Sequence, residues 1–255
     1  MRDSLTGLAR PSYSFRTKTA VVTGAAGDLG SAVSLALSAA GAEVIAVDLQ
    51  LDRLERVVSR ARELHGQIFP VQADVTSEVD VARYAEVAAS RGGVDLFFNN
   101  AGIEGRASPI VKLSLEEFRH VQEVNVIGVL AGLRAILPLM KAGGSIVNTA
   151  SMAALRGSAD MAAYVSSKHA VLGLTRTASI EAAALGLRVN AVCPGPIQGR
   201  MMQSIEQQRA VLGGSAGGGT RNYAEIEDVV DVVLYLFSDG SRLLNGQALE
   251  MAQLT

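Results

Sequence analysis

Residues 19–30 read Thr19-Ala20-Val21-Val22-Thr23-Gly24-Ala25-Ala26-Gly27-Asp28-Leu29-Gly30, and this stretch decides the fold of the 255-residue chain. A short β-branched run leads into three glycines, and a segment with helical patterning follows them. Glycines at such a junction allow a tight turn, close approach of the backbone to a pyrophosphate, and close packing of the helix on a sheet. The helix N-terminus adds free N–H groups and a partial positive charge. The stretch therefore predicts a dinucleotide-binding turn, with Gly24, Gly27, Asp28, Leu29 and Gly30 as its binding residues.

Outward from this turn, short apolar runs alternate with segments of helical length. Runs without polar alternation, such as Leu96-Phe97-Phe98, suit strands that are covered on both faces. The alternation indicates βαβ units and a parallel sheet, hence a Rossmann-like, doubly wound α/β fold with helices on both faces. We expect strands at 19–23, 43–47, 67–71, 94–98, 144–148, 187–193 and 247–251, and helices at 29–40, 51–65, 77–90, 114–141, 162–185 and 224–238.

No linker divides the chain. We therefore expect an N-terminal tail over residues 1–17 and a single dinucleotide-binding and catalytic domain over residues 18–255. The glycine-rich run at 213–219 has few packing side chains and high backbone freedom, so it is either a flap over a ligand or a surface loop.

Composition excludes several classes of function. The formal net charge is −2 and the basic residues are scattered, which argues against nucleic acid and anionic membranes as partners. A single cysteine, Cys193, excludes an intrachain disulfide, and three isolated histidines give no reason to expect a metal. The first eighteen residues lack the apolar core of a signal peptide, and Asn125, Arg134 and Pro138 interrupt the apolar stretch at 124–140. We expect a soluble, cytoplasmic protein.

Asp48 lies at the end of the second expected strand, where a carboxylate can bind the adenosine ribose hydroxyls of NAD and repel the 2′-phosphate of NADP. The position therefore favours NAD as cofactor. Two other interpretations remain open. Asp48 precedes a helix and could cap it, and the nearby Arg53 could serve a phosphate.

Tyr164 and Lys168 are four residues apart on an expected helix, so they project from one face. A nearby ammonium favours the phenolate, so we expect Lys168 to lower the pKa of Tyr164 and make the tyrosine a proton donor and acceptor for a substrate alcohol. Ser151 lies thirteen residues upstream of the tyrosine and could hold the substrate oxygen. A plain surface pair on an amphipathic helix is the alternative interpretation.

In their order and spacing, these pieces resemble the short-chain dehydrogenase/reductase family over roughly residues 18–250. The motifs that carry the resemblance are the glycine turn, Asp74-Val75, Asn99-Asn100-Ala101-Gly102, Asn125, Ser151, Tyr164 with Lys168, Arg188-Val189-Asn190 and Pro194-Gly195.

The resemblance implies a sheet of about seven parallel strands, a nicotinamide cofactor and reversible hydride transfer to or from a secondary alcohol. It implies that Tyr164 is the acid–base, that Lys168 also holds the nicotinamide ribose, and that Ser151 binds the substrate oxygen. By the same likeness Asn125, in the long helix 114–141, positions a water beside Lys168; a buried amide that satisfies helix backbone is the alternative. The remaining implied cofactor contacts are Asp74 and Val75 at the adenine, Asn99, Ala101 and Gly102 after the fourth strand, and Pro194 and Ile197 at the nicotinamide. The resemblance implies that Asn99 also stabilises the sheet.

Three features depart from the family pattern. Asp28 stands where the usual motif has glycine, and we expect its side chain to point outward and cofactor binding to survive. Gly199, followed by Arg200, stands where many relatives have a threonine that binds the carboxamide. The usual C-terminal Asp-Gly-Gly is absent, which weakens the family's implication of a tetramer, and we expect a homo-oligomer, either tetramer or dimer.

The substrate that we expect is a moderately apolar small-molecule secondary alcohol or ketone. The alternatives are a 3-oxoacyl-thioester reductase and a non-catalytic NAD(H)-binding sensor or scaffold. Residues that could shape the substrate site are the methionines Met152, Met201 and Met202 and the charged Glu104, Arg106, Arg156 and Arg200.

Overall fold

A computed structural model describes residues 13–212 and 223–251. The glycine-rich segment at 213–219 and most of the expected tail lie outside these ranges. Seven parallel strands form one sheet, as the family resemblance implies, and their order is β3-β2-β1-β4-β5-β6-β7. The strands are β1 (Thr19–Thr23), β2 (Glu43–Asp48), β3 (Gln67–Gln72), β4 (Val94–Asn99), β5 (Met140–Thr149), β6 (Arg188–Pro194) and β7 (Ala248–Met251).

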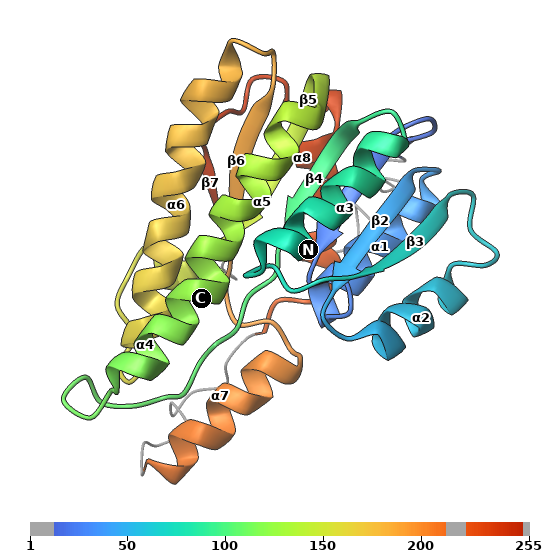
Figure 1. Cartoon of the computed structure of the whole chain (residues 1–255). Coiled ribbons are helices and arrows are strands. Elements are labelled where there is room, and N and C mark those ends of the chain that lie inside the picture. Colours follow the sequence, from blue (N-terminus) through green and yellow to red (C-terminus); the bar gives the residue numbers. More distant parts are fainter. Residues whose placement is uncertain (1–12, 213–222, 252–255) are drawn as a thin grey trace, which may run out of the picture.

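Helices cover both faces of the sheet, which makes the fold doubly wound (Figure 1). Each face has its own apolar core, and the alternating side chains of β1 show the division: Val21 packs in one core, and Ala20 and Val22 pack in the other. The first core lies under α3 (Glu78–Ser90), α5 (Gly128–Ile136) and α6 (Ala162–Ala183); the second lies under α1 (Asp28–Ala39), α2 (Leu51–Arg60) and α8 (Ile226–Phe237).

The long helix expected over 114–141 is interrupted. It consists of α4 (Leu115–Gln122), a π-helical turn at Glu123–Ile127, α5, and a 3₁₀ turn at Leu137–Leu139. Such π turns inside helices are rare and gather at functional sites. The apolar pattern is continuous through the turn, so periodicity alone could not reveal it.

One further helix, α7 (Arg200–Val211), was not expected. None of its twelve residues is buried, so it carries no apolar stripe that periodicity could detect. In Figure 1 it stands apart from the two helical layers, beyond the ends of the strands.

The helical run Leu115–Leu139 is long and apolar enough to cross a membrane by length and composition alone. Helices in the core of a soluble protein pass the same test. Here Val129, Leu133 and Ile136 are buried against the sheet, so the apolar composition of this run is explained by its packing.

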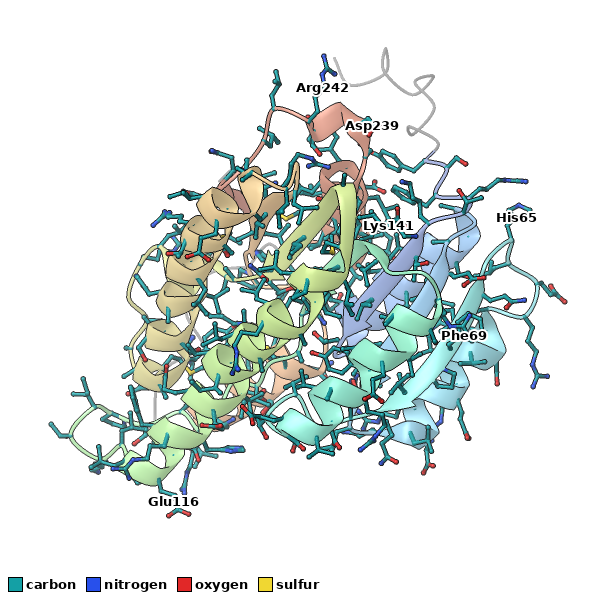
Figure 2. The ribbon with its side chains drawn as sticks, turned by 45° about the horizontal axis from the view of Figure 1, so that its top comes forward. His65, Phe69, Glu116, Lys141, Asp239 and Arg242 are labelled. Carbon is teal, nitrogen blue, oxygen red and sulfur yellow. The ribbon has the colours of Figure 1, made fainter. Side chains whose placement is uncertain are left out.

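A charge cluster fixes the amino end of the sheet. Asp95 accepts hydrogen bonds from Lys18 Nζ (3.0 Å), Lys141 Nζ (3.1 Å) and the Thr19 N–H (2.9 Å). Burial alone would raise the pKa of Asp95, but these donors outweigh it and hold the pKa below its ordinary value. Figure 2 shows Lys141 in the upper middle of the molecule and Glu116, near the start of α4, at the lower left edge. The candidate site lies at the opposite end of the strands from this cluster.

Candidate active site

A cleft of about 1090 Å³ opens at the carboxyl ends of the strands. The strand order reverses between β1 and β4, and ligands of doubly wound folds bind at such a switch point. Ser151, Tyr164 and Lys168 line the cleft, as do Gly24, Gly27, Asp28, Leu29, Gly30, Asp48, Asp74, Val75, Ala101, Gly102, Pro194 and Ile197. Of the predicted catalytic and cofactor-binding residues, only Asn99 and Asn125 are absent from the lining.

The glycine turn after β1 has the geometry that its sequence predicts. Gly24 has φ +65°, a conformation that side chains rarely adopt. A Cβ on Gly30 would lie 2.1 Å from the Gly24 carbonyl oxygen, so only glycine lets α1 approach the turn this closely. Gly27 is the N-cap of α1 and no side chain caps the helix. The turn therefore leaves the first N–H groups of α1 available to an anion.

Asp48 ties the end of β2 to this turn. One carboxylate oxygen accepts from the Ala26 N–H (2.9 Å) and the other from the Gln50 N–H (3.0 Å). The helix-cap interpretation is wrong, because the N-cap of α2 is Gln50 and it is not capped by a side chain. Asp48 lines the cleft, and each of its oxygens can accept a further hydrogen bond. Arg53 also lines the cleft and is exposed.

Asn99 has the sheet-stabilising role that the resemblance implies but does not line the cleft. Asn99 is 3% exposed and does not line the cleft; its Nδ2 donates to the Val129 carbonyl (2.9 Å) and fastens α5 to the sheet. Asn100 lines the cleft instead. Its Nδ2 donates to the Thr23 carbonyl (3.0 Å), and its Oδ1 accepts from the Thr149 hydroxyl (3.1 Å). The double asparagine pointed to this network, but the sequence does not say which amide is buried.

Val75 and Asp74 lie where the adenine end of a dinucleotide was expected. Asp74 Oδ1 accepts from both the backbone N–H (2.9 Å) and the hydroxyl (2.7 Å) of Thr76, which fixes the loop after β3. Val75 packs on the long helical run, since a Cβ on Gly128 would lie 2.9 Å from Val75 Cγ2.

Ser151 and Tyr164 come together from β5 and α6. Ser151 follows β5 and caps the short 3₁₀ turn Met152–Ala154, with its Oγ accepting from the Ala153 N–H (3.1 Å). Tyr164 lies in the first turn of α6. Burial raises the pKa of Tyr164, a hydrogen bond with Ser151 lowers it, and the negative charge of Glu104 raises it again, so the net direction is upward.

Lys168 lies one helical turn after the tyrosine and is 3% exposed. Its Nζ donates to the Thr149 carbonyl (2.8 Å) and lies 5.6 Å from the centre of the Tyr164 ring. Burial lowers the pKa of Lys168 to about 8. The predicted lowering of the tyrosine pKa by this lysine is therefore not seen in the protein alone, where burial dominates. An ammonium has three donors, and two of them remain for a ligand.

Asn125 lies in the π turn and is fully buried. Its Oδ1 accepts from the Ile103 N–H (2.8 Å), and its Nδ2 donates to the Ile103 carbonyl (2.8 Å) and to Ser167 Oγ (3.0 Å). The side chain thus braces the loop after β4 against α6. A Cβ on Gly102 would lie 3.1 Å from Asn125 Oδ1 and 3.4 Å from Lys168 Nζ, so these groups converge behind the cleft.

The Asp28 side chain is bonded to Arg200 instead of standing free in solvent, and both residues line the cleft. Asp28 Oδ1 accepts from Arg200 Nε (2.8 Å), and Oδ2 accepts from the Arg200 N–H (2.8 Å). Arg200 Nη2 also donates to the Ala26 carbonyl (3.0 Å). These two residues, 172 positions apart in the sequence, join the glycine turn to α7.

Three methionines also line the cleft. They are Met152, Met201 and Met202, and the charged Glu104 and Arg156 line it with them. Arg106 lies instead in a second, smaller cavity. In the ranges that the structure describes, no three His, Cys, Asp or Glu side chains gather where they could hold a metal ion.

Known proteins resemble the chain over almost its whole length. A family model described as enoyl-(acyl carrier protein) reductase matches residues 24–252. Levodione reductase of Leifsonia aquatica is 33% identical over 255 residues, covering 94% of this chain and 95% of that protein. Cyclohexanol dehydrogenase of Acinetobacter sp. (strain SE19) is 34% identical over 238 residues, covering 92% and 93%.

Solved structures of dehydrogenases also resemble this chain over most of its length. The NAD⁺-bound form of a xylitol dehydrogenase has a TM-score of 0.85 and 31% identity, covering 93% of this chain and 98% of that one. A short chain dehydrogenase from Burkholderia cenocepacia J2315 in complex with NADP has a TM-score of 0.83 and 29% identity, covering 93% and 97%.

Proposed function

The chain belongs to the short-chain dehydrogenase/reductase family, and we propose that it is an NAD-dependent oxidoreductase that interconverts a secondary alcohol and its ketone. One observation carries the proposal. Ser151, Tyr164 and Lys168 meet in the same cleft as the glycine turn after β1. An acid–base group and a dinucleotide turn in one cleft are what hydride transfer to or from an alcohol requires.

The glycine turn fits a dinucleotide. A Cβ at Gly30 would clash with the Gly24 carbonyl, so glycine at this position keeps α1 close to the turn. The start of α1 has no side-chain cap and offers its N–H groups to a pyrophosphate. Bound NAD would supply the hydride acceptor or donor. In our proposal Asp48 receives the adenosine ribose, Asp74 and Val75 border the adenine, and Lys168 donates to the nicotinamide ribose. Pro194 and Ile197 would shape the nicotinamide end.

Tyr164 takes the substrate hydroxyl proton during oxidation and returns it during reduction. Ser151 donates a hydrogen bond to the substrate oxygen and stabilises the charge that develops there. Lys168 keeps one donor on the Thr149 carbonyl and presents the rest to the cleft, so its positive charge stabilises the deprotonated tyrosine. Asn125 positions these groups by fixing the loop at Ile103 against α6.

The proposed substrate is a small, moderately apolar secondary alcohol or ketone, and a cyclic one is the first candidate to test. The methionines of the cleft give an adaptable apolar wall, and one curated relative is named for cyclohexanol. A 3-oxoacyl-thioester reductase is the second candidate, favoured by the description of the family model.

We also propose a cytoplasmic homo-oligomer, either dimer or tetramer. On the layer of α5 and α6, Ile127 is 44% exposed and Ile180 is 77% exposed, which is typical of a surface that another copy covers.

The test is the reduction of NAD⁺ and NADP⁺, followed at 340 nm, with a panel of cyclic and linear secondary alcohols. We expect turnover with NAD⁺ preferred, and Asp48→Ala should lower the preference for NAD⁺ over NADP⁺ by about ten-fold or more. The ratio of kcat/KM is the readout, because losing the bond to Ala26 would weaken both cofactors alike. Asp52→Ala, an exposed carboxylate on α2, is the matched control.

Three outcomes would contradict the proposal in different places. An unchanged cofactor ratio in Asp48→Ala would refute the ribose assignment. Turnover only of 3-oxoacyl thioesters would establish the second candidate. Direct binding of NADH without turnover of any alcohol, ketone or thioester would indicate a sensor.

A further inference from the structure

Helix α7 covers the cleft without a core of its own. None of its residues is buried, yet Arg200, Met201, Met202, Ile205 and Arg209 all line the cleft. Apolar burial therefore contributes little to its position, and polar side-chain contacts help to hold it. One set lies at each end of the helix and reaches a different part of the protein, and the Tyr223 hydroxyl donates to Glu206 between them.

The first tether joins the start of α7 to the glycine turn. Asp28 accepts two hydrogen bonds of 2.8 Å from Arg200, one from the side chain and one from the backbone N–H. The backbone contact makes Asp28 a cap for the N-terminus of α7, where a negative charge is favourable. The guanidinium also reaches the Ala26 carbonyl at 3.0 Å, so it lies directly beside the turn.

The second tether joins the end of α7 to the loops at the substrate end of the cleft. Gln208 Oε1 accepts from the Ala107 N–H (2.7 Å), and Arg209 Nη2 donates to Ser158 Oγ (2.7 Å). Neither contact touches the glycine turn. The two ends of α7 can therefore be released separately by substitution.

Gly199 makes the first tether possible. Its backbone is extended, with φ 174°, so any residue could adopt the conformation. A Cβ here would nevertheless lie 2.8 Å from Asp28 Oδ2. Glycine at 199 thus leaves room for the Asp28 carboxylate to reach the N–H of Arg200, and the two unusual residues, Asp28 and Gly199, fit each other.

Charge explains why an aspartate is tolerated beside a pyrophosphate site. A free carboxylate on the first turn of α1 would repel the phosphates. With Arg200 bonded to it the pair has no net charge, and the positive partner lies between the carboxylate and the turn at Ala26.

We infer that Asp28 and Arg200 form a clasp that closes the start of α7 over the bound cofactor, and that Arg200 is a positioning residue whose release sets how fast the cofactor enters and leaves. The inference rests on the proposed function, because it takes the dinucleotide to lie on the glycine turn. The clasp is half-exposed, with 47% of the Arg200 side chain and 35% of the Asp28 side chain accessible, so it can open without disturbing the core.

The test measures NADH association and dissociation by stopped-flow fluorescence in the wild type, Asp28→Ala, Arg200→Ala and the double variant. An exposed ion pair contributes up to about 1 kcal/mol, which corresponds to about a five-fold change in rate. We expect both rate constants to rise by about three- to five-fold in Asp28→Ala, with the equilibrium Kd changing less. In Arg200→Ala we expect dissociation to rise by the same factor and the Kd to weaken, because the freed Asp28 carboxylate repels the phosphates. The double variant should be no faster than the singles, because either substitution alone opens the clasp.

Arg209→Ala is the matched control, since it removes an arginine from the other tether of the same helix. It should raise the substrate KM and leave NADH exchange unchanged. Equal acceleration by Arg209→Ala would show that α7 loosens as a whole and would overturn the clasp. Unchanged rates in Asp28→Ala and Arg200→Ala, or faster dissociation without faster association in Asp28→Ala, would also overturn it. Wild-type protein that binds neither NADH nor NADPH would instead refute the proposed function.

Discussion

The floor of the cleft and the helix above it are held by different kinds of contact. On the floor, Asn125 is fully buried and Lys168 is 3% exposed, and both bond to backbone carbonyls. Above the cleft, the clasp between Asp28 and Arg200 is half-exposed and joins two side chains. The side chains of Asn125 and Lys168, which we call the floor, are therefore fixed by the core around them. The contacts that hold α7, which we call the cover, are weak enough to break.

This difference matches what each region must do. Groups that transfer a proton gain from being fixed before the substrate arrives. A cover must open for every exchange of ligand, and contacts worth no more than about 1 kcal/mol allow that. Substitutions on the floor should therefore have large effects on catalysis and stability, and substitutions in the cover should have small ones.

The largest effect is expected at Tyr164. Tyr164→Phe keeps the ring and removes the hydroxyl, so kcat should fall by about 10²–10⁴-fold while NADH binding is retained. Steady-state kinetics and a direct NADH titration measure the two quantities. Tyr235→Phe is the control, because it removes a hydroxyl that bonds only to Gly240 on the surface. A Tyr164→Phe variant with a tenth or more of wild-type kcat would refute the acid–base assignment.

The second prediction concerns the stability cost of Lys168. Burial lowers its pKa from 10.5 to about 8, so between these values the unfolded chain binds the proton more readily than the folded one, and wild-type stability rises with pH. Lys168→Met should be inactive, yet more stable than wild type by up to about 3 kcal/mol at pH 7. The advantage should shrink from pH 8 to 10.5.

Urea unfolding at pH 7, 9 and 10 measures this difference, and Lys112→Met, on an exposed loop, controls for the loss of a charge. A stability difference between Lys168→Met and wild type that does not change with pH would show that burial does not lower the pKa of Lys168.

An intermediate effect is expected at Asn125. Asn125→Ala leaves the Ile103 N–H and carbonyl without their partner, and should lower the free energy of unfolding by about 1–3 kcal/mol. Substrate KM should rise too, because the loop at Ile103 and Glu104 borders the cleft. Asn148→Ala is the control: it removes a fully buried amide that bonds Thr175, away from the cleft, and should change stability alone. An unchanged KM in Asn125→Ala would limit that residue to a structural role.

The smallest effect is expected where the cover meets the turn. Gly199→Ala places a Cβ against the Asp28 carboxylate, and should lower the free energy of unfolding by about 1 kcal/mol. In an Asp28→Gly background the same substitution should cost nothing, since the obstructing group is gone. Chemical unfolding of the four proteins in this cycle gives the coupling. Additive effects would show that the two positions are independent.

Much of the floor could be predicted from the sequence, because its signals are local. Glycines in a strand–helix junction and a Tyr-x-x-x-Lys pair on one helix face fix their own geometry. The failures came where a distant partner decides. The Asn99 amide points into the core, where it donates to the Val129 carbonyl. The helix changes to a π turn at Asn125, whose side chain accepts a hydrogen bond from the Ile103 N–H.

Helix α7 is a second feature that the sequence alone could not predict. Its sequence has no apolar stripe, so no pattern predicts it, and Arg200 looked available to a substrate. Only the fold brings this arginine to Asp28, 172 residues away.

The sequence by itself determined the alternation of strands and helices apart from α7, the glycine turn and the pairing of Tyr164 with Lys168, because hydrophobic periodicity and short spacings act within a few residues. The tertiary structure decided which amides are buried, that burial rather than the lysine dominates the pKa of Tyr164, and that Asp28 serves α7. These outcomes depend on desolvation and on partners far apart in the chain, and neither is set until the sheet and its helices have packed.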